Sequence, residues 1–289
     1  MQPWTKPTTP PGPTGTGQGI LRPAEHQRVV LTRRFPCADS LAAVVENYWW
    51  LEWSLPAGES YPAQTLPHPT CHLTVERGRT RPEVTADPVV VTGLVTKRFD
   101  VDISGAGWVW GVKFRPGGLA AVTGRNAKEL RDRVVPAADL LPATVVEPLR
   151  HLGAGAGTPE PATDLVDRTD EILAPLAKLA AGDARYAELL TMISEMLTDR
   201  DLIRTGQLEQ RWSITERSLQ RLFERYVGVG PKWVLARYRM HDVVAELDRG
   251  YDGSMADLAA TYGWYDQAHF VRDFTRLVGV PPSRYRSRR

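Results

Sequence analysis

Three side chains that can recognise nucleic-acid bases share one predicted helix near the end of this 289-residue chain. At about 100° per residue, Arg217, Gln220 and Arg221 fall on one face of that helix, opposite a stripe of leucine, phenylalanine and tyrosine. Arginine and glutamine can make bidentate hydrogen bonds to guanine and adenine edges in the major groove of DNA. An ordinary solvent-exposed helix face has the same pattern, so this segment alone leaves both interpretations open.

An internal repeat favours the nucleic-acid interpretation. Shifting residues 215–231 by 51 positions aligns a cap residue, a large apolar residue, an arginine, a phenylalanine, a glycine and a proline with their counterparts: Thr215 with Asp266, Leu219 with Phe270, Arg221 with Arg272, Phe223 with Phe274, Gly228 with Gly279, and Pro231 with Pro282. One turn earlier the offset is 50, which pairs Leu208 with Leu258 and Ser213 with Gly263. The chain therefore contains a duplicated unit rather than a chance match.

Each copy has the pattern of a helix-turn-helix unit. Thr215 and Asp266 are predicted N-caps of the second helices, and Gly228 follows the end of the first of these, where a left-handed cap favours glycine. Between the units, Pro231 is expected to begin a helix and Gly250 to end it. About nineteen residues at 1.5 Å each span roughly 28 Å, close to the ~34 Å between successive turns of the major groove. One chain could therefore contact two adjacent turns.

Charge is distributed in agreement with two contacts to a polyanion. Residues 211–239 hold seven basic and two acidic side chains, and residues 272–289 hold six arginines and one aspartate. The intervening residues 241–271 hold one arginine and six acids. Two basic islands around an acidic spacer are typical of two separate phosphate-facing surfaces, although two solvated helix faces would also give this pattern.

The repeat resembles the AraC family of bacterial regulators over roughly residues 183–286. The motifs that carry the resemblance are TERSLQRLF (215–223), GVGP (228–231), LAATYGW (258–264), DQAHFVRDF (266–274) and GVPPSRYR (279–286). The resemblance implies a sequence-specific DNA-binding transcription regulator whose base contacts fall on Arg217, Gln220, Arg221, Gln267, Ala268, His269 and Arg272. One departure is Glu209 after Leu208, where the second unit has Ala259 after Leu258. A bulkier residue there predicts a looser or repositioned first unit.

The preceding part of the chain is predicted to be a β-rich barrel or sandwich. Short β-branched and aromatic runs, CHLTVE (71–76), PVVVT (88–92) and AGWVWGVKF (106–114), are separated by proline and glycine turns. Residues 41–50 form an apolar stretch that we expect to be helical. The segments WGVKFRPGGL (110–119) and LRDRVVP (130–136) resemble a β-rich domain often fused ahead of AraC-type DNA-binding domains, which implies a sensory or regulatory role.

The predicted architecture is an α+β chain of several parts. Residues 1–24 are expected to be a disordered tail, 25–152 the β-rich regulatory domain, 153–182 a linker and connecting helix, and 183–289 the all-α domain with two helix-turn-helix units. Trp50, Trp53, Trp110 and Arg115 are the candidate ligand-binding residues of the β-rich domain, with an ordinary core role for the tryptophans left open.

The sequence favours no enzyme, cofactor or metal site. Cys71 and His72 would point to opposite faces of a strand, and with His68 they lack an evident fourth ligand. With Cys37 and Cys71 as the two cysteines, no disulfide framework is expected. Neither a signal peptide nor a membrane span is evident, so a cytoplasmic protein is expected. Double-stranded DNA is the predicted partner; a small-molecule effector, a homodimer and, for an activator, RNA polymerase are left open.

Overall fold

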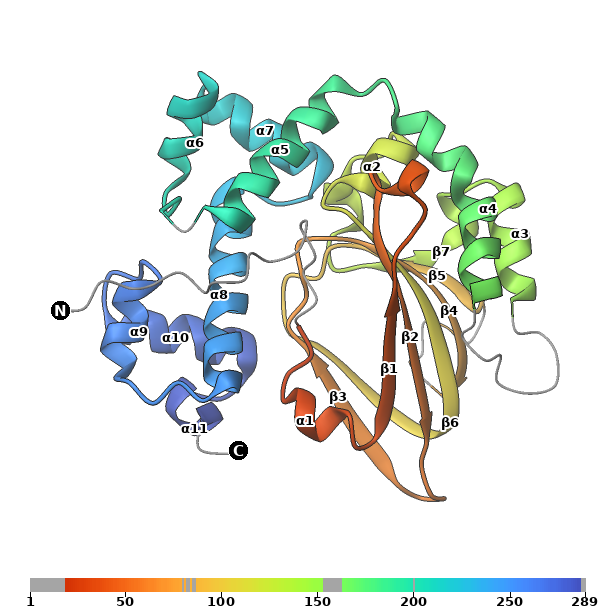
Figure 1. The fold of residues 1–289 in the computed structure, drawn as a ribbon, viewed down its shortest axis with the longest axis horizontal. Coiled ribbons are helices and arrows are strands. Elements are labelled where there is room, and N and C mark those ends of the chain that lie inside the picture. Colours follow the sequence, from red (N-terminus) through yellow and green to blue (C-terminus); the bar gives the residue numbers. More distant parts are fainter. Residues whose placement is uncertain are drawn as a thin grey trace.

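The computed structural model describes residues 19–79, 81, 84, 87–152, 163–199 and 201–286. An antiparallel sheet with flanking helices forms the N-terminal part, and the described elements from residue 163 onward are all helices (Figure 1). The predicted combination of a β-rich domain with an all-α domain is confirmed. Within the described ranges, every helix is too short or too polar to cross a membrane.

The sheet is organised around one long strand. Its described strands are β1 (Val30–Phe35), β2 (Val45–Ser54), β3 (Ser60–Thr65), β4 (His72–Arg79), β5 (Val89–Thr92), β6 (Phe99–Phe114) and β7 (Val134–Pro136). They follow the order β1-β2-β6-β4-β5-β7, and β3 pairs with the first half of β6. Trp110, in the second half of β6, lies opposite Trp50 on one side and Val75 on the other. Because β6 pairs with β2, β3 and β4, it joins the strands on its two sides into one sheet.

One face of this sheet is covered by helices. Among them, α2 (Gly118–Thr123), α3 (Ala143–His151) and α4 (Thr163–Ala180) lie beside β4 to β7 and the upper end of the sheet in Figure 1. Trp50 and Trp110 are 0% and 1% exposed in this core. The indole Nε1 of Trp110 donates to Thr169 Oγ1 of α4 at 3.0 Å. Because strand side chains alternate, the neighbouring residues of the same strands face the opposite side.

Two local predictions differ from the structure. The expected helix over residues 41–50 is wrong: a 3-10 turn η1 (Asp39–Leu41) is followed by strand β2. Aromatic and β-branched residues there pair with β1 and β6, and this tertiary pairing outweighs a helical period in a short apolar run. The expected tail lies outside the described residues up to 18, but residues 19–24 belong to the fold. Leu21 is buried, and its backbone N–H donates to Gln64 O at 2.9 Å.

Two short 3-10 turns, η3 (Ala127–Leu130) and η4 (Ala137–Asp139), and a one-turn helix α1 (Pro23–His26) complete the N-terminal part. The C-terminal part consists of α5 (Ala184–Thr198), α6 (Thr205–Trp212), α7 (Glu216–Tyr226), α8 (Pro231–Arg249), α9 (Met255–Thr261), α10 (Gln267–Val278) and α11 (Pro282–Arg286). Helix α8 runs between α6–α7 and α9–α10 and lies next to the sheet domain (Figure 1). It begins at Pro231 and is capped by the left-handed Gly250, as predicted.

Helix α8 is tied to the sheet domain through a buried arginine. Arg237 is 2% exposed and donates to Pro67 O at 2.8 Å and to Thr96 O at 2.6 Å. Its guanidinium also lies over the ring of Trp233, 4.3 Å from the centroid. Burial lowers the pKa of Arg237 to about 10, so it remains charged at neutral pH. Two carbonyls and an aromatic face thus replace the water that a buried cation needs.

Both helix-turn-helix units contact the sheet domain as well. From α7, the guanidinium of Arg225 donates to the carbonyls of Gly124 (2.6 Å) and Arg125. Beyond α10, Val278 O accepts from Arg98 Nη1 at 2.6 Å. With Arg237 between them, these contacts hold the two units in one orientation relative to the sheet domain.

Acidification is expected to destabilise this arrangement. The rings of His68 and His241 stack with centroids 3.6 Å apart, and His241 Nε2 lies 3.3 Å from Pro67 O. Burial, and secondarily the charge of Arg237, lowers the pKa of His241 to about 3. The unfolded chain binds a proton below pH 6.5 that the folded chain rejects, so stability present above pH 6.5 is lost as the pH falls toward 3.

His241→Gln is expected to reduce this pH dependence. At pH 5 the protonation of an unfolded histidine costs the folded state up to about 2 kcal/mol when its folded pKa is near 3. The melting temperature measured at pH 7.5 and pH 5 should therefore fall less in the variant than in the unmodified protein. His151→Gln, at an exposed position, is the control. An equal fall in melting temperature in all three proteins would contradict the assignment of this pH dependence to His241.

Candidate DNA-binding interface and ligand cavity

The first helix-turn-helix unit consists of α6 and α7. Ser213 ends α6 in the left-handed region, with φ 48°. The N-cap Thr215 then accepts the backbone N–H of Ser218 on its Oγ1 at 3.3 Å and starts α7. Leu219 and Phe223 on α7 are fully buried, so the amphipathic stripe positions the helix and leaves its polar face outside.

The second unit, α9 and α10, repeats this geometry. Gly263 has φ 76° at the position of Ser213, and the cap Asp266 accepts the N–H of His269 at 2.7 Å. The same turn bond also recurs, from Ile214 N to Glu209 O at 3.1 Å and, fifty residues later, from Trp264 N to Ala259 O at 2.9 Å. Glu209 is half-buried where Ala259 is buried. The turn of the first unit therefore has its regular form despite the larger side chain.

All seven residues predicted to contact DNA bases are exposed. They occupy the solvent-facing sides of α7 and α10: Arg217, Gln220, Arg221, Gln267, Ala268, His269 and Arg272. Two of them have partners within their own helix, since Gln220 donates to Glu224 Oε1 at 2.8 Å and His269 Nε2 lies 3.1 Å from Asp273 Oδ2. Among the described residues, Arg217, Arg221 and Arg272 have no hydrogen-bond or ion-pair partner. These three guanidinium groups are available for an external anion or base.

Other cations of the two basic islands are used inside the protein. Arg211 pairs with Asp199 at 2.7 Å, and Arg276 with Asp273 at 2.9 Å. Arg225 and Arg237 donate to carbonyls of the sheet domain. Arg239 donates to Tyr262 O at 3.2 Å. The charge count from sequence therefore overstated how many cations are free for a polyanion.

Removal of either cap is expected to loosen its recognition helix. Thr215→Ala and Asp266→Ala each delete a side-chain acceptor for an N-terminal N–H and should cost about 1 kcal/mol. Amide hydrogen exchange of α7 or α10, respectively, should accelerate roughly fivefold while α8 is unaffected. Asp252→Ala, at an exposed position outside the helices, is the matched control. Unchanged exchange in both cap variants would show that packing alone positions these helices.

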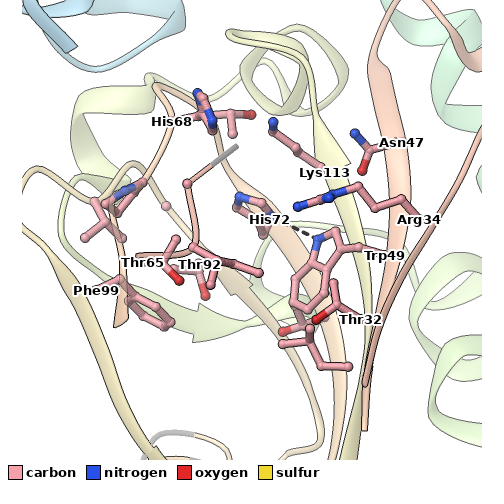
Figure 2. Close-up of a pocket in the computed structure, with 18 of the residues that line it drawn as sticks. Thr32, Arg34, Asn47, Trp49, Thr65, His68, His72, Thr92, Phe99 and Lys113 are labelled. Atoms are coloured by element: carbon pink, nitrogen blue, oxygen red, sulfur yellow. Dashed lines mark hydrogen bonds between the residues drawn. The ribbon is translucent and has the colours of Figure 1, made fainter. Parts of the chain in front are cut away.

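A separate cavity of about 190 Å³ lies on the sheet face opposite the core of Trp50 and Trp110. Side chains from β1, β2, β4 and β6 and from the loops around residues 65–70 and 92–99 surround it (Figure 2). Gly111 on β6 is part of this arrangement because a Cβ atom there would collide with the indole of Trp49. Glycine lets that indole lie against the sheet and form a wall of the cavity.

The four candidate ligand-binding residues chosen from the sequence do not line this cavity. Trp50 and Trp110 face the helix-covered core, and Trp53 packs in a smaller cluster at the far end of the sheet. Arg115 donates from Nε to Ala42 O beside α5 and lines a different hollow. Trp49, one residue from Trp50, is the tryptophan that reaches the cavity. Strand alternation decides between the two, and sequence reasoning by residue type missed it.

The neighbours of His72 in the cavity decide which of its ring nitrogens carries a proton. His72 faces the cavity and Cys71 the buried core, on opposite sides as alternation requires. Trp49 Nε1 donates to His72 Nδ1 at 3.2 Å (Figure 2), so the remaining proton of the neutral ring resides on Nε2. Burial, then the charges of Lys113 and Arg81, lowers the pKa of His72 to about 3. His72 is therefore a neutral hydrogen-bond donor at physiological pH.

Comparison with known proteins assigns both parts of the chain. Residues 208–288 match a helix-turn-helix domain family, and residues 33–136 match a domain family of unknown function, DUF6597. The uncharacterized HTH-type transcriptional regulator YidL of Escherichia coli is 31% identical over 87 residues, which are 27% of this chain and 29% of YidL. The chain thus spans less than a third of the length of this relative.

Solved structures of ToxT from Vibrio cholerae are also similar. An apo ToxT variant has a TM-score of 0.42 at 11% identity over 87% of this chain and 98% of its own. ToxT with an unsaturated fatty acid bound has a TM-score of 0.42 at 12% identity over 89% and 95%. With the two helix-turn-helix units and the family matches, the chain carries an AraC-type helix-turn-helix domain in residues 208–288, behind a domain of the DUF6597 family in residues 33–136.

Proposed function

We propose that this protein is a sequence-specific DNA-binding transcription regulator that places α7 and α10 in two successive segments of the major groove. The observation that carries the proposal is the pair of capped recognition helices with exposed arginines that have no partner among the described residues: Arg217 and Arg221 on α7, and Arg272 on α10. The intervening α8 has 19 residues, a length of roughly 28 Å. That separation suits adjacent turns of one groove.

Selection of bound sequences from a random DNA pool tests this function. The full chain at near-physiological salt should enrich a site with two short half-sites about one helical turn apart. The control is a variant with alanine at Arg217, Arg221 and Arg272. It should enrich no site and should melt at the same temperature as the unmodified protein. A folded protein that enriches nothing, or a variant that enriches the same site, would overturn the proposal.

The sheet domain is proposed to control DNA binding through its contacts with α8. Arg237 and His241 of α8 both contact Pro67, and Pro67 and His68 line the cavity on their other side. A ligand that displaces Pro67 or His68 would therefore act directly on α8, the helix that joins the two recognition units. The alternative, a sheet domain that serves only to bind another protein, would leave the cavity without a role.

A further inference from the structure

The cavity has a positive lining. Its charged lining residues are Arg34, Arg81 and Lys113, and no carboxylate is among the described residues that line it. Two carboxylates lie directly behind: Glu46 contacts Lys113 at 2.8 Å, and Glu76 contacts Arg81 at 2.5 Å. Three cations against two anions leave an excess of one positive charge. The charge balance therefore suits a single negative charge in the cavity.

Three buried polar atoms at the cavity lack hydrogen-bond partners among the described residues. The side chain of Arg81 is 9% exposed; Nε and Nη2 are bound to Glu76, and Nη2 also to Thr92 Oγ1 at 3.0 Å. Its Nη1 is buried without a hydrogen-bond partner among the described residues, as are Thr32 Oγ1 and Asn47 Oδ1. Buried polar atoms are nearly always satisfied. The Arg81 N–H and the Thr32 hydroxyl can each donate to a group in this space, whereas Asn47 Oδ1 can only accept. The two orphan donors point to an acceptor group that belongs there.

The remaining walls are apolar and define the size of the ligand. Trp49 and Phe99 stand on opposite sides of the cavity in Figure 2, and Leu51, Ile20 and Val95 are also among its lining residues. A cavity of about 150 Å³ holds one benzene molecule, so about 190 Å³ accommodates a single ring with a small substituent. Figure 2 shows Arg34, Lys113 and His72 turned toward the same space.

We propose that this cavity binds a small organic monoanion: a carboxylate on an apolar body about the size of one ring. The carboxylate lies among Arg34, Lys113 and the free Nη1 of Arg81, with His72 as a neutral donor, and the apolar body contacts Trp49 and Phe99. Its role as an effector rests on the proposed function. Ligand binding would affect α8 through Pro67 and His68, which line the cavity and contact Arg237 and His241 of that helix.

Thermal melting of the full chain with matched probes tests the ligand class. Benzoate and phenylacetate should raise the melting temperature by about 3 °C at roughly ten times their Kd. Benzamide and phenylacetamide have the same shape without the charge and should have little effect. Inorganic phosphate should also have little effect. Equal shifts with the amides would overturn the anion preference, and an equal shift with phosphate would indicate an adventitious anion only.

Two neighbouring arginines on β1 provide matched variants. Both are exposed. Arg34 lines the cavity, whereas Arg33 points to the other side of the strand. Arg34→Gln should raise the Kd of benzoate, measured by calorimetry, roughly tenfold or more because it removes a charge-assisted hydrogen bond. Arg33→Gln should leave the Kd unchanged. Equal Kd values for the two variants would place the anion elsewhere.

The coupling is tested separately on the DNA site obtained by selection. Saturating benzoate should change the Kd for that site at least fivefold, a coupling in the range usual for allosteric effectors. The Arg34→Gln variant should show no change at the same benzoate concentration. Benzoate binding with unaltered DNA affinity would retain the site and overturn the coupling. Benzoate binding by a protein that selects no DNA would instead overturn the regulator function and leave the anion site in place.

Discussion

Replacement of Arg221 by alanine is expected to weaken binding to the selected DNA site by about 1–3 kcal/mol, or roughly 5- to 150-fold in Kd. Arg272→Ala should have an effect of the same size in the other half-site. Each guanidinium is exposed and has no partner in the part of the chain that the structure describes, so its removal should leave the fold intact and the loss should reflect the DNA contact. The two losses should add, because the positions lie on different units.

The sequence dependence of the loss separates base contacts from phosphate contacts. If Arg221 contacts a base, the variant should tolerate all four bases at one position of the half-site while other positions keep their preference. Uniform weakening across sequences, with a shallower salt dependence, would identify a phosphate contact instead. Arg168→Ala removes an exposed arginine from α4, outside the helix-turn-helix units, and is the matched control. Wild-type affinity and preference in both recognition-helix variants would contradict the proposed interface.

Arg237→Met is expected to lower the free energy of unfolding by about 2–5 kcal/mol. The substitution retains the apolar stem but leaves Pro67 O and Thr96 O without the donors that approach them at 2.8 and 2.6 Å. A loss of that size corresponds to a melting temperature lower by roughly 5–15 °C. Since Arg237 lies between the two domains, the variant should also melt in two separated transitions in calorimetry.

Lys232→Met is the control for the clamp between the domains. Lys232 is exposed on the same helix, five residues earlier, so its replacement by methionine should leave the melting temperature within about 1 °C. A single transition at the normal temperature in Arg237→Met would mean that the domains do not depend on this contact. The proposed coupling between the cavity and the DNA-binding units would then have to run through residues other than Pro67 and His68.

The helix-turn-helix units are local structures, and the sequence predicted them well. Thr215 and Asp266 cap their helices, Pro231 and Gly250 bound α8, and Gly279 adopts the left-handed conformation. Each of these features depends on hydrogen bonds and backbone dihedrals within about four residues. A repeat of such signals at an offset of 51 or 50 residues reinforces them. The turn hydrogen bond to Glu209 O has the same form as that to Ala259 O, and a looser first unit stays a prediction.

The sheet domain shows the opposite behaviour. Residues 41–50 were predicted helical, and pairing of β2 with β1 and β6 makes most of them a strand. The pattern of apolar residues is ambiguous because both faces of this sheet carry large aromatic side chains. Whether Trp49 or Trp50 faces the cavity depends on the register with Gly111 and Trp110, which are sixty residues away in the chain.

By itself the sequence predicted the two helix-turn-helix units and the faces of their recognition helices, since near neighbours in the chain decide these. Only the tertiary structure decided which cations are free and which side chains form the cavity. Arg221 and Arg225 look alike in sequence, yet one is exposed and the other donates to Gly124 O. The carbonyl acceptors of a buried arginine come from segments that are distant in the chain. The pattern of charged and aromatic residues does not predict how those segments pack together.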